Sequence, residues 1–324
     1  GHYFSKKISR FSSKYISFIL TKYFLPHLGN NFIDKAYNLG LMVNKLLLTK
    51  MGYINDTDRD SFMYKRVDMA GYLISIIFRD LYFRFHNKLS HNINQYIRNI
   101  KNETIISSNT LVQSITEDIR KYFESDIINE GFLYAFKNAW GLKNGGKCKD
   151  GIVQDMLRGS YTGMISNIRR TNNAISKSAK IRHPHSLHAT TFGIFCPSET
   201  PDGGNVGLRK NLSLMAMISF YVYSDPLLIA LIDFGILMKE SVAVTELFKY
   251  GKVIVNNKWI GVHLFPIQLA YHMRLLRRNG LINIYTSISY NCKLNTVYIC
   301  TESGRPMRPI AIVENNRILY RKGE

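Results

Sequence analysis

The side chains best suited to acid–base chemistry lie close together near the middle of the chain. Glu199 and Asp202 could serve as a general acid and base, and His188 could serve as a base. Prolines and glycines punctuate the same stretch, so residues 198–203 are predicted to form a tight loop and not a helix or a central strand. Scaffolds often present functional groups on such loops. The alternative is a structural turn whose acids cap neighbouring backbone amides.

A run of basic residues precedes this loop. Arg169 and Arg170 fall at the C-terminal end of a predicted helix, where cations interact favourably with the helix dipole. Lys177, Lys180 and Arg182 follow in a polar segment that carries almost no acid. The helix dipole explains the presence of the two arginines at the helix end, but it does not explain the three cations that follow. The run therefore predicts a positive track suited to phosphate groups.

The composition also favours an anionic partner. The 324 residues include 43 Lys and Arg against 23 Asp and Glu, which gives a formal net charge of +20. This surplus makes nucleic acid the first candidate, while an anionic membrane surface or a cationic solubility strategy stays open. Apolar residues make up 46% of the chain, which favours a folded core over a disordered tail.

Several classes of protein receive no support from the sequence. No apolar run reaches the roughly 18 residues that a membrane-spanning helix needs, and residues 1–7 do not resemble a secretion signal. The cysteines, Cys148, Cys196, Cys292 and Cys300, are too far apart for a Cys-x-x-Cys zinc pattern. We expect reduced thiols in an intracellular protein and no metal site.

Hydrophobic periodicity predicts the elements that position these residues. Residues 11–50 predict two helices separated at Pro26 and Gly29, and residues 72–97 predict a longer helix with one apolar face. Residues 103–126 show a similar helical pattern. The prediction for the C-terminal part is a hairpin at 252–261 with an Asn-Asn turn, a helix at 267–279, and strands at 282–289 and 296–300.

These elements predict an α+β fold with several subdomains. The N-terminal half is expected to be mainly helical, and the C-terminal half is expected to mix helices and strands.

The central string also carries a long motif, formed by His188, Thr190, Phe192, Gly193, Cys196, Pro197, residues 199–203 and residues 207–213. It closely resembles the second-largest (beta-type) subunit of multisubunit DNA-dependent RNA polymerases. That family carries His-x-Thr-x-aromatic-Gly, Cys-Pro-x-Glu-Thr-Pro-Glu-Gly and Gly-Leu-x-Lys-Asn-Leu-Ser. A match of this length is far more specific than a lone Gly-x-Gly.

Other segments resemble the same family in the expected order. Residues 58–60, with Lys65, Arg66, Asp68 and Gly71, are similar to the junction between the family's lobe and protrusion. Residues 165–172 are similar to the fork motif Leu-Ser-x-Leu-Arg-Arg-Thr-Asn in its eukaryotic form. Segments around Trp259, Gly280 and Arg305 resemble the external region. The Arg-Arg-Thr-Asn sequence favours the archaeal, eukaryotic and large-DNA-virus branch.

The chain departs from the family pattern at four positions. Thr57 and Ala139 replace an Asp and an Asn, and His185 stands where the family usually has Arg. Asp202 replaces Glu, which shortens the reach of the carboxylate by one methylene.

The resemblance covers about residues 16–315 and corresponds to a middle slice of a beta-type subunit. It implies a lobe-like part at 1–71, a protrusion-like helical part at 72–133, a fork-like domain at 134–217 and an external-1-like α/β domain at 218–324. The segment from Arg169 to Arg182 would form fork loops near the downstream edge of the transcription bubble.

The resemblance also implies a role in transcription without catalysis by this chain alone. The family's metal-holding aspartates belong to the largest subunit, so Mg²⁺ is expected there and no cofactor is expected here. The expected partners are the largest subunit, the rest of the second-largest subunit, the DNA template, the DNA–RNA hybrid and ribonucleoside triphosphates. The expected location is the nucleus, or the cytoplasm or virion if the chain is viral. The residues expected to bind nucleic acid are Arg169, Arg170, Asn172, Lys177, Lys180, Arg182, His188, Glu199, Asp202, Asn205, Lys210 and Asn211.

Two other functions remain open on the sequence. The chain could be a stand-alone basic nucleic-acid-binding protein, or it could be an inert remnant of a polymerase gene.

Overall fold

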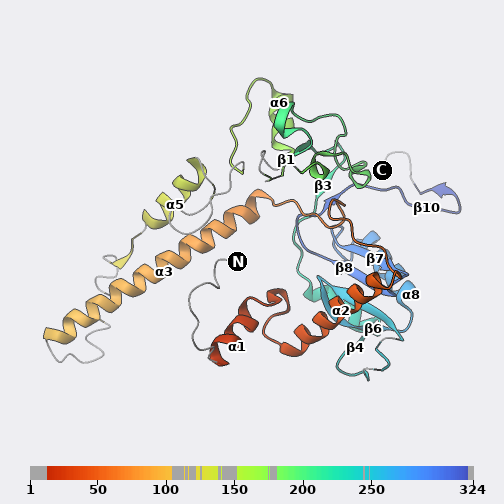
Figure 1. The fold of residues 1–324 in the computed structure, drawn as a ribbon, viewed down its shortest axis with the longest axis horizontal. Coiled ribbons are helices and arrows are strands. Elements are labelled where there is room, and N and C mark those ends of the chain that lie inside the picture. The colour runs from red at the N-terminus through yellow and green to blue at the C-terminus, as the bar shows by residue number, and fades with distance from the viewer. Residues whose placement is uncertain are drawn as a thin grey trace. The chain divides into compact units, whose positions relative to one another are not determined.

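The computed structural model describes residues 13–103, 113, 116, 122–124, 126–137, 140, 152–173, 175, 181–243, 245–247 and 249–319. The chain divides into two compact units, Gly1–Arg59 with Ile218–Arg305, and Asp60–Met217 with Pro306–Glu324. Helices dominate the N-terminal half, and helices mix with strands in the C-terminal half (Figure 1). The α+β prediction is confirmed, while the division into four subdomains stays a prediction.

The first unit combines four α-helices of the described chain with a mixed sheet. Its elements are α1 (Ser13–Lys22), the 3-10 helix η2 (Pro26–Leu28), α2 (Phe32–Lys50), α7 (Asp225–Asp233), β4 (Leu237–Met238), β5 (Gly251–Val255), β6 (Lys258–His263), α8 (Pro266–Arg278), β7 (Ser287–Asn291) and β8 (Thr296–Cys300). The strand order is β4-β6-β5-β8-β7. Only the β5–β8 pair of this sheet is parallel.

The predicted hairpin and the helix after it are confirmed. Asn256 and Asn257 join β5 to β6 with φ values of +48° and +62°, the left-handed pair that a type I′ turn requires. Gly280, with φ of +74°, follows the end of α8. The core of this unit lies between α8 and the sheet, where Met273, Val253 and Val297 are fully buried.

The strand predicted at residues 282–289 was wrong over its first half, because β7 begins only at Ser287. The amide of Tyr285 donates to Asn283 Oδ1 at 2.9 Å, and the amide of Thr286 donates to the Asn283 carbonyl at 3.0 Å. This turn around Asn283 competes with strand pairing, which the apolar pattern alone did not reveal.

A buried ion pair attaches α2 to the sheet. Asp34 is 6% exposed and Lys239 is 5% exposed, and their side chains pair directly. Lys258 Nζ lies 3.1 Å from the second carboxylate oxygen of Asp34. Burial by itself would raise the pKa of Asp34, but hydrogen bonds and charge from Lys239 and Lys258 outweigh burial and hold the pKa below its ordinary value.

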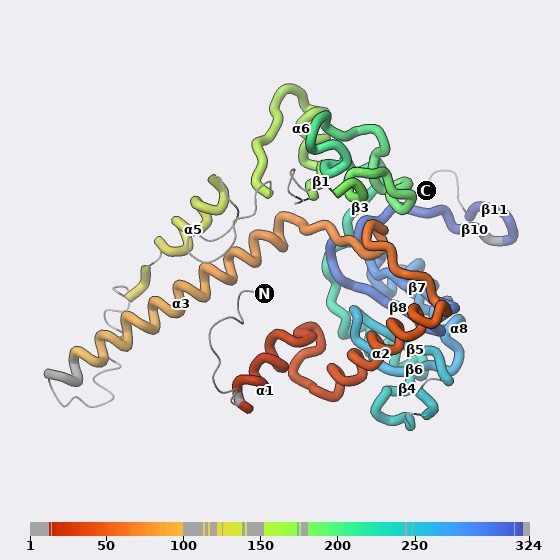
Figure 2. Tube along the Cα trace, viewed as in Figure 1, coloured from red at the N-terminus to blue at the C-terminus, as the bar shows by residue number. Residues whose placement is uncertain are grey.

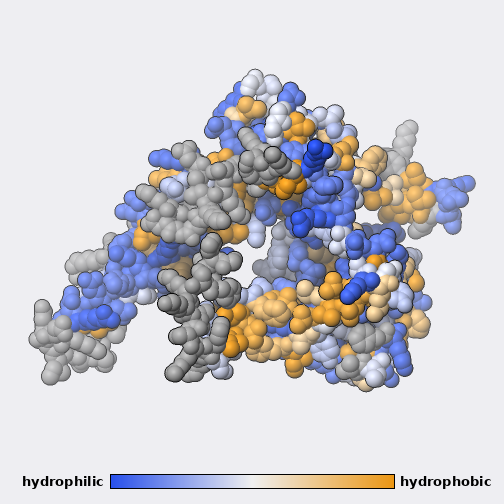
Figure 3. All heavy atoms as spheres, in the orientation of Figure 1, coloured by the Kyte–Doolittle hydropathy of each residue, from blue (hydrophilic) through white to orange (hydrophobic). Residues whose placement is uncertain are grey.

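The neighbouring Lys35 is also buried and has a different task. Its ammonium donates to the carbonyls of Leu20, Thr21 and Phe24 at 2.6, 3.0 and 2.7 Å. These carbonyls lie at the C-terminal end of α1, where helices leave acceptors unsatisfied. Lys35 therefore attaches α1 to α2, as Asp34 attaches α2 to the sheet. Apolar side chains gather on the visible faces of α1 and α2 (Figure 3).

The second unit carries a long helix and the predicted loop region. Its elements are α3 (Ala70–Glu103), α5 (Asp126–Lys137), α6 (Tyr161–Ile168), β1 (Arg170–Asn172), the 3-10 helices η4 (His183–His185), η5 (Ala189–Thr191) and η6 (Gly203–Asn205), β2 (Arg209–Asn211), β9 (Pro306–Met307), β10 (Val313–Glu314) and β11 (Arg317–Ile318). In sequence, β3 (Met217–Ile218) spans the boundary between the units.

The helix α3 confirms the prediction at residues 72–97 and runs further at both ends (Figure 2). Its apolar face packs against α5, and Leu81 approaches Gly131 so closely that a Cβ at residue 131 would lie 2.2 Å from a Leu81 methyl group. Most of the helix-like pattern at residues 103–126 lies outside the described residues. Within the described part of the chain, no helix has the length and apolar character needed to cross a bilayer.

The buried ion pair predicts a large loss of stability for Asp34→Ala. The substitution leaves the Lys239 ammonium buried without its carboxylate, which costs about 3–5 kcal/mol. Urea unfolding in a Trp140→Phe background, followed by the fluorescence of Trp259, measures the loss. Asp233→Ala removes an exposed carboxylate of the same unit and is expected to change stability by less than about 0.5 kcal/mol. Equal effects of the two substitutions would show that the ion pair contributes little.

The lowered pKa of Asp34 predicts how this contribution depends on pH. A carboxylate with a depressed pKa stabilises the folded state above its unfolded pKa of about 3.9. The contribution is therefore complete at pH 7 and is lost as pH falls below about 4 and passes through the folded pKa. We expect the stability difference between the parent and Asp34→Asn to shrink as pH falls from 7 to 3. A difference that stays constant over this range would contradict the assignment.

Candidate nucleic-acid interface

The predicted site is built on a short antiparallel ladder. Strands β1 and β2 pair in the register Arg170 with Asn211, Thr171 with Lys210, and Asn172 with Arg209. On its other side, the chain around β2 bonds to the segment before the loop, because the amide of Cys196 donates to the Asn211 carbonyl at 2.9 Å. The β2 strand thus lies between the basic segment and the acidic loop.

Strand alternation separates the side chains of the ladder into two faces. Arg170, Asn172, Arg209 and Asn211 share one face, and Lys210 lies on the other, because successive residues of a strand point to opposite sides. Arg209 and Lys210 therefore point to opposite sides of the ladder, whereas Arg169 precedes β1 as the C-cap of α6.

A polar relay connects Glu199, in the acidic loop at residues 198–203, to the face of the ladder that carries Arg170. Asn211 is 3% exposed, and its amide nitrogen lies 2.6 Å from Glu199 Oε1 and 2.6 Å from Ser166 Oγ. Ser166 Oγ in turn donates to Glu199 Oε1 at 2.8 Å. The amide oxygen of Asn211 accepts from Arg170 Nε at 3.1 Å. The carboxylate of Glu199 thereby fixes the position of the Arg170 guanidinium without contacting it.

Arg169 closes the turn that follows β2. Its Nη2 donates to the Ser213 carbonyl at 2.5 Å and lies 3.3 and 3.5 Å from the carbonyls of Leu214 and Ala216. This guanidinium therefore satisfies backbone acceptors within the unit, in addition to any role toward a ligand.

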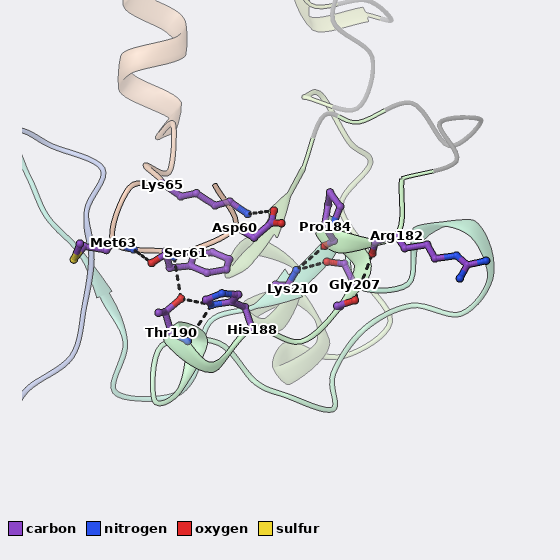
Figure 4. A network of polar contacts seen from close by, with 12 residues as sticks. Asp60, Ser61, Met63, Lys65, Arg182, Pro184, His188, Thr190, Gly207 and Lys210 are labelled. Carbon is purple, nitrogen blue, oxygen red and sulfur yellow. Dashed lines mark hydrogen bonds and ion pairs between the residues drawn. The ribbon is translucent and has the colours of Figure 1, made fainter. Parts of the chain in front are cut away.

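Lys210 is also engaged within the unit (Figure 4). Its ammonium donates to the carbonyls of Gly207 and Pro184, and it lies 5.9 Å from the centre of the Phe62 ring. Lys65 lies over the same ring at 4.9 Å and forms an ion pair with Asp60 at 3.6 Å. Burial, followed by repulsion from Lys65, lowers the pKa of Lys210, and Asp60 partly opposes this shift.

His188 holds the start of η5. Its Nδ1 accepts from the amide of Thr190 at 3.2 Å and lies 2.7 Å from the Thr190 hydroxyl. The same hydroxyl accepts from the amide of Phe62 at 2.9 Å, so His188 helps to join residues 60–65 to the loop region (Figure 4).

The acidic loop needs glycine where it approaches the preceding segment. Gly207 has φ of +71°, and a Cβ at this position would lie 2.0 Å from the His185 carbonyl oxygen. The Thr200 hydroxyl bridges the loop by accepting from the amide of Gly207 at 2.8 Å and donating to the Arg209 carbonyl at 3.0 Å. His185, which replaces the family's usual Arg, lies 2.6 Å through Nδ1 from the Val206 carbonyl.

The predicted site residues thus fall into three groups. The side chains of the first group all make hydrogen bonds within the unit: Arg169, Arg170, His188, Glu199, Lys210 and Asn211. Asn172, Arg182 and Asp202 are exposed, and Asn205 is half-buried in η6. Lys177 and Lys180 lie outside the described residues. Nucleic-acid binding by these side chains stays a prediction.

Sequence reasoning missed four residues that shape the site: Phe62, Ser166, Thr200 and Arg209. Ser166 stood inside the quoted fork motif, but its partners Glu199 and Asn211 lie more than thirty residues away, so local spacing gave no signal of its role. Arg209 occupies the unspecified position of the Gly-Leu-x-Lys-Asn pattern, so the resemblance did not draw attention to it. Within the described residues, no group of three or more His, Cys, Asp or Glu side chains could hold a metal ion.

The thiol of Cys196 lies beside the acidic loop. Its sulfur is 3.5 Å from Ser198 Oγ. The hydrogen bond from the Ser198 side chain, together with the amides of Ser198 and Glu199, lowers the pKa of Cys196.

This arrangement predicts that Ser198→Ala raises the pKa of Cys196. Alkylation by iodoacetamide depends on the thiolate, so its rate–pH profile at Cys196 should shift to higher pH. Peptide mass spectrometry separates this cysteine from the others, and the exposed Cys292 provides the control in the same sample. An unchanged profile at Cys196 would contradict the role of Ser198.

The geometry defines an α+β protein with a basic polar site on a short ladder and its adjoining loop. Three family models match the chain in order: RNA polymerase Rpb2 domain 2 at residues 3–68, domain 3 at residues 154–218, and domain 4 at residues 253–314. The β1–β2 ladder and the acidic loop lie within the match to domain 3, and Phe62 and Lys65 lie within the match to domain 2.

Similar curated proteins come from distant organisms. DNA-directed RNA polymerase II subunit RPB2 of Encephalitozoon cuniculi is 32% identical over 306 residues, covering 93% of this chain and 26% of the relative. DNA-directed RNA polymerase II subunit 2 of Arabidopsis thaliana is 32% identical, covering 95% and 25%. DNA-directed RNA polymerase subunit Rpo2 of Saccharolobus shibatae is 30% identical, covering 93% and 26%.

The chain belongs to the family of second-largest RNA polymerase subunits, as the sequence motifs indicated, and corresponds to a central part of such a subunit. It spans about a quarter of the length of the relatives it matches.

Proposed function

We propose that this chain forms the fork and the neighbouring wall of the DNA/RNA cleft in a DNA-directed RNA polymerase. The observation that carries the proposal is the relay from Glu199 through Asn211 to Arg170. The relay holds a guanidinium in place before any ligand arrives, and a pre-positioned cation binds phosphate with less loss of side-chain entropy. Arg182, exposed just before η4, adds charge on the same segment of the chain.

In this proposal the chain contributes binding and not bond formation. Phosphoryl transfer depends on positioning and on divalent metal ions. We place the metal-holding aspartates and the Mg²⁺ in the largest subunit. The partners would be that subunit, the remainder of the second-largest subunit, the DNA template, the DNA–RNA hybrid and ribonucleoside triphosphates. The names of the relatives, all DNA-directed RNA polymerase subunits, support this assignment.

Co-purification followed by nucleotide incorporation tests the proposal. The tagged chain should capture a largest polymerase subunit from its source cells, and the captured complex should extend a primed DNA–RNA scaffold. Binding of nucleic acid without a largest subunit would indicate a stand-alone binding protein. Loss of both activities would indicate an inert remnant, and either result would overturn the proposal.

The proposal predicts a specific salt dependence in the assembled enzyme. Replacing both Arg170 and Arg182 by Gln should weaken retention of the hybrid, because each lost phosphate contact removes part of the counterion release. The slope of log affinity against log salt is negative, and it should become less negative by about 0.7–0.9 for each lost contact. Filter retention over a salt series measures this slope.

Arg278→Gln is the matched control for charge, because Arg278 is exposed in the other unit. If the double variant kept the parent's slope, or if the control changed the slope equally per charge, the fork assignment would fail.

A further inference from the structure

The face of the β1–β2 ladder that carries Arg170 and Arg209 borders a cavity of about 430 Å³. The end of α5, residues 153–157, the last turn of α6 and the ladder surround it. This volume is in the lower part of the range for small-molecule sites. It is large enough for one or two phosphate groups.

Cations outnumber acids in the lining of the cavity. Lys137, Arg170 and Arg209 line it, against a single acid, Asp155. Gln154 and Asn167 add polar groups to the lining, and Phe136, Val153 and Leu157 supply its apolar part. The excess of cations over acids in this lining favours an anionic ligand.

The guanidinium of Arg209 supplies an independent observation. Its Nε is buried, and no described residue provides a hydrogen-bond acceptor for it. Buried donors are normally satisfied, so an unpaired donor beside a cavity indicates a missing acceptor. Arg170 differs, because its Nε already donates to Asn211. The two guanidinium groups share one face of the ladder. The Nε of Arg170 has an acceptor in Asn211, whereas the Nε of Arg209 has none among the described residues.

We propose that this cavity is an oxyanion site that binds a phosphate group, with Arg209 as its principal ligand. An arginine donates through Nε and one Nη in a fork that matches two oxygens of a phosphate. A phosphate held in this way would supply the acceptor that Arg209 Nε lacks. Arg170, held by Asn211, presents a second cation from the neighbouring strand.

The source of the phosphate is either a free polyphosphate or the backbone of a nucleic-acid strand. Both present the same tetrahedral oxyanion. The inference goes beyond the polymerase role, because polyphosphate binding is a property of the chain alone and can be measured without the other subunits. Its failure would leave the co-purification result unchanged, so the two ideas are tested separately.

Calorimetry with inorganic pyrophosphate on the full chain tests the site. We expect Arg209→Gln to weaken pyrophosphate binding about tenfold, because the substitution removes both the charge and the fork. Arg278→Gln removes the same charge from an exposed position in the other unit and should change the affinity by less than about twofold. Equal losses in the two variants, or no binding by the parent chain, would overturn the proposal.

Asp155→Asn gives a second test in the opposite direction. Removing the one acid of the lining should strengthen pyrophosphate binding severalfold, and this outcome does not depend on the folding of the Arg209 variant. An unchanged or weaker affinity would count against the site.

A short single-stranded RNA without terminal phosphates then separates the two sources. Displacement of pyrophosphate by this RNA in the parent, with weaker RNA binding by Arg209→Gln, identifies the strand backbone. Pyrophosphate binding that the RNA does not displace identifies a free polyphosphate. Both results support the oxyanion site.

Discussion

The buried amide of Asn211 is the constraint on which the candidate site depends. A primary amide carries an acceptor on one side and donors on the other. In a position only 3% exposed, both sides must find partners within the protein. Here the donors face Glu199 and Ser166, and the acceptor faces Arg170. An aspartate would face the Glu199 carboxylate with a second negative charge. A leucine would leave Arg170 Nε without its acceptor and would leave Glu199 and Ser166 with only their bond to each other.

The relay has an electrostatic consequence. Glu199 positions Arg170 through the neutral amide of Asn211, and not through a direct ion pair between the two charges. A direct pair would use the guanidinium's fork on the carboxylate. Here the amide accepts from Nε, and the side chain of Arg170 lines the cavity. The contacts of Asn211 thus stabilise the loop without a direct ion pair that would neutralise the charge of Arg170.

Much of the fold could be predicted from local signals. The Asn-Asn turn between β5 and β6 and the long apolar stripe of α3 are local properties, and both predictions were confirmed. The motif also identified the chain segment that contains the site. The roles of its side chains were not predictable in the same way, because β1 and β2 pair across some forty residues. Without that register, the sequence does not show that Arg170 and Arg209 share a face of the ladder.

The two basic doublets show why net charge alone gives a poor estimate of a binding surface. Arg169 donates to backbone carbonyls after β2, and Lys210 donates to carbonyls beside η4 and η6. Their neighbours Arg170 and Arg209 share one face of the ladder and line the cavity. In each of these two pairs of adjacent cations, one cation donates to backbone carbonyls and the other lines the cavity. The formal charge of +20 therefore includes cations that the fold itself uses, and the pairing of β1 with β2 shows which cations line the cavity.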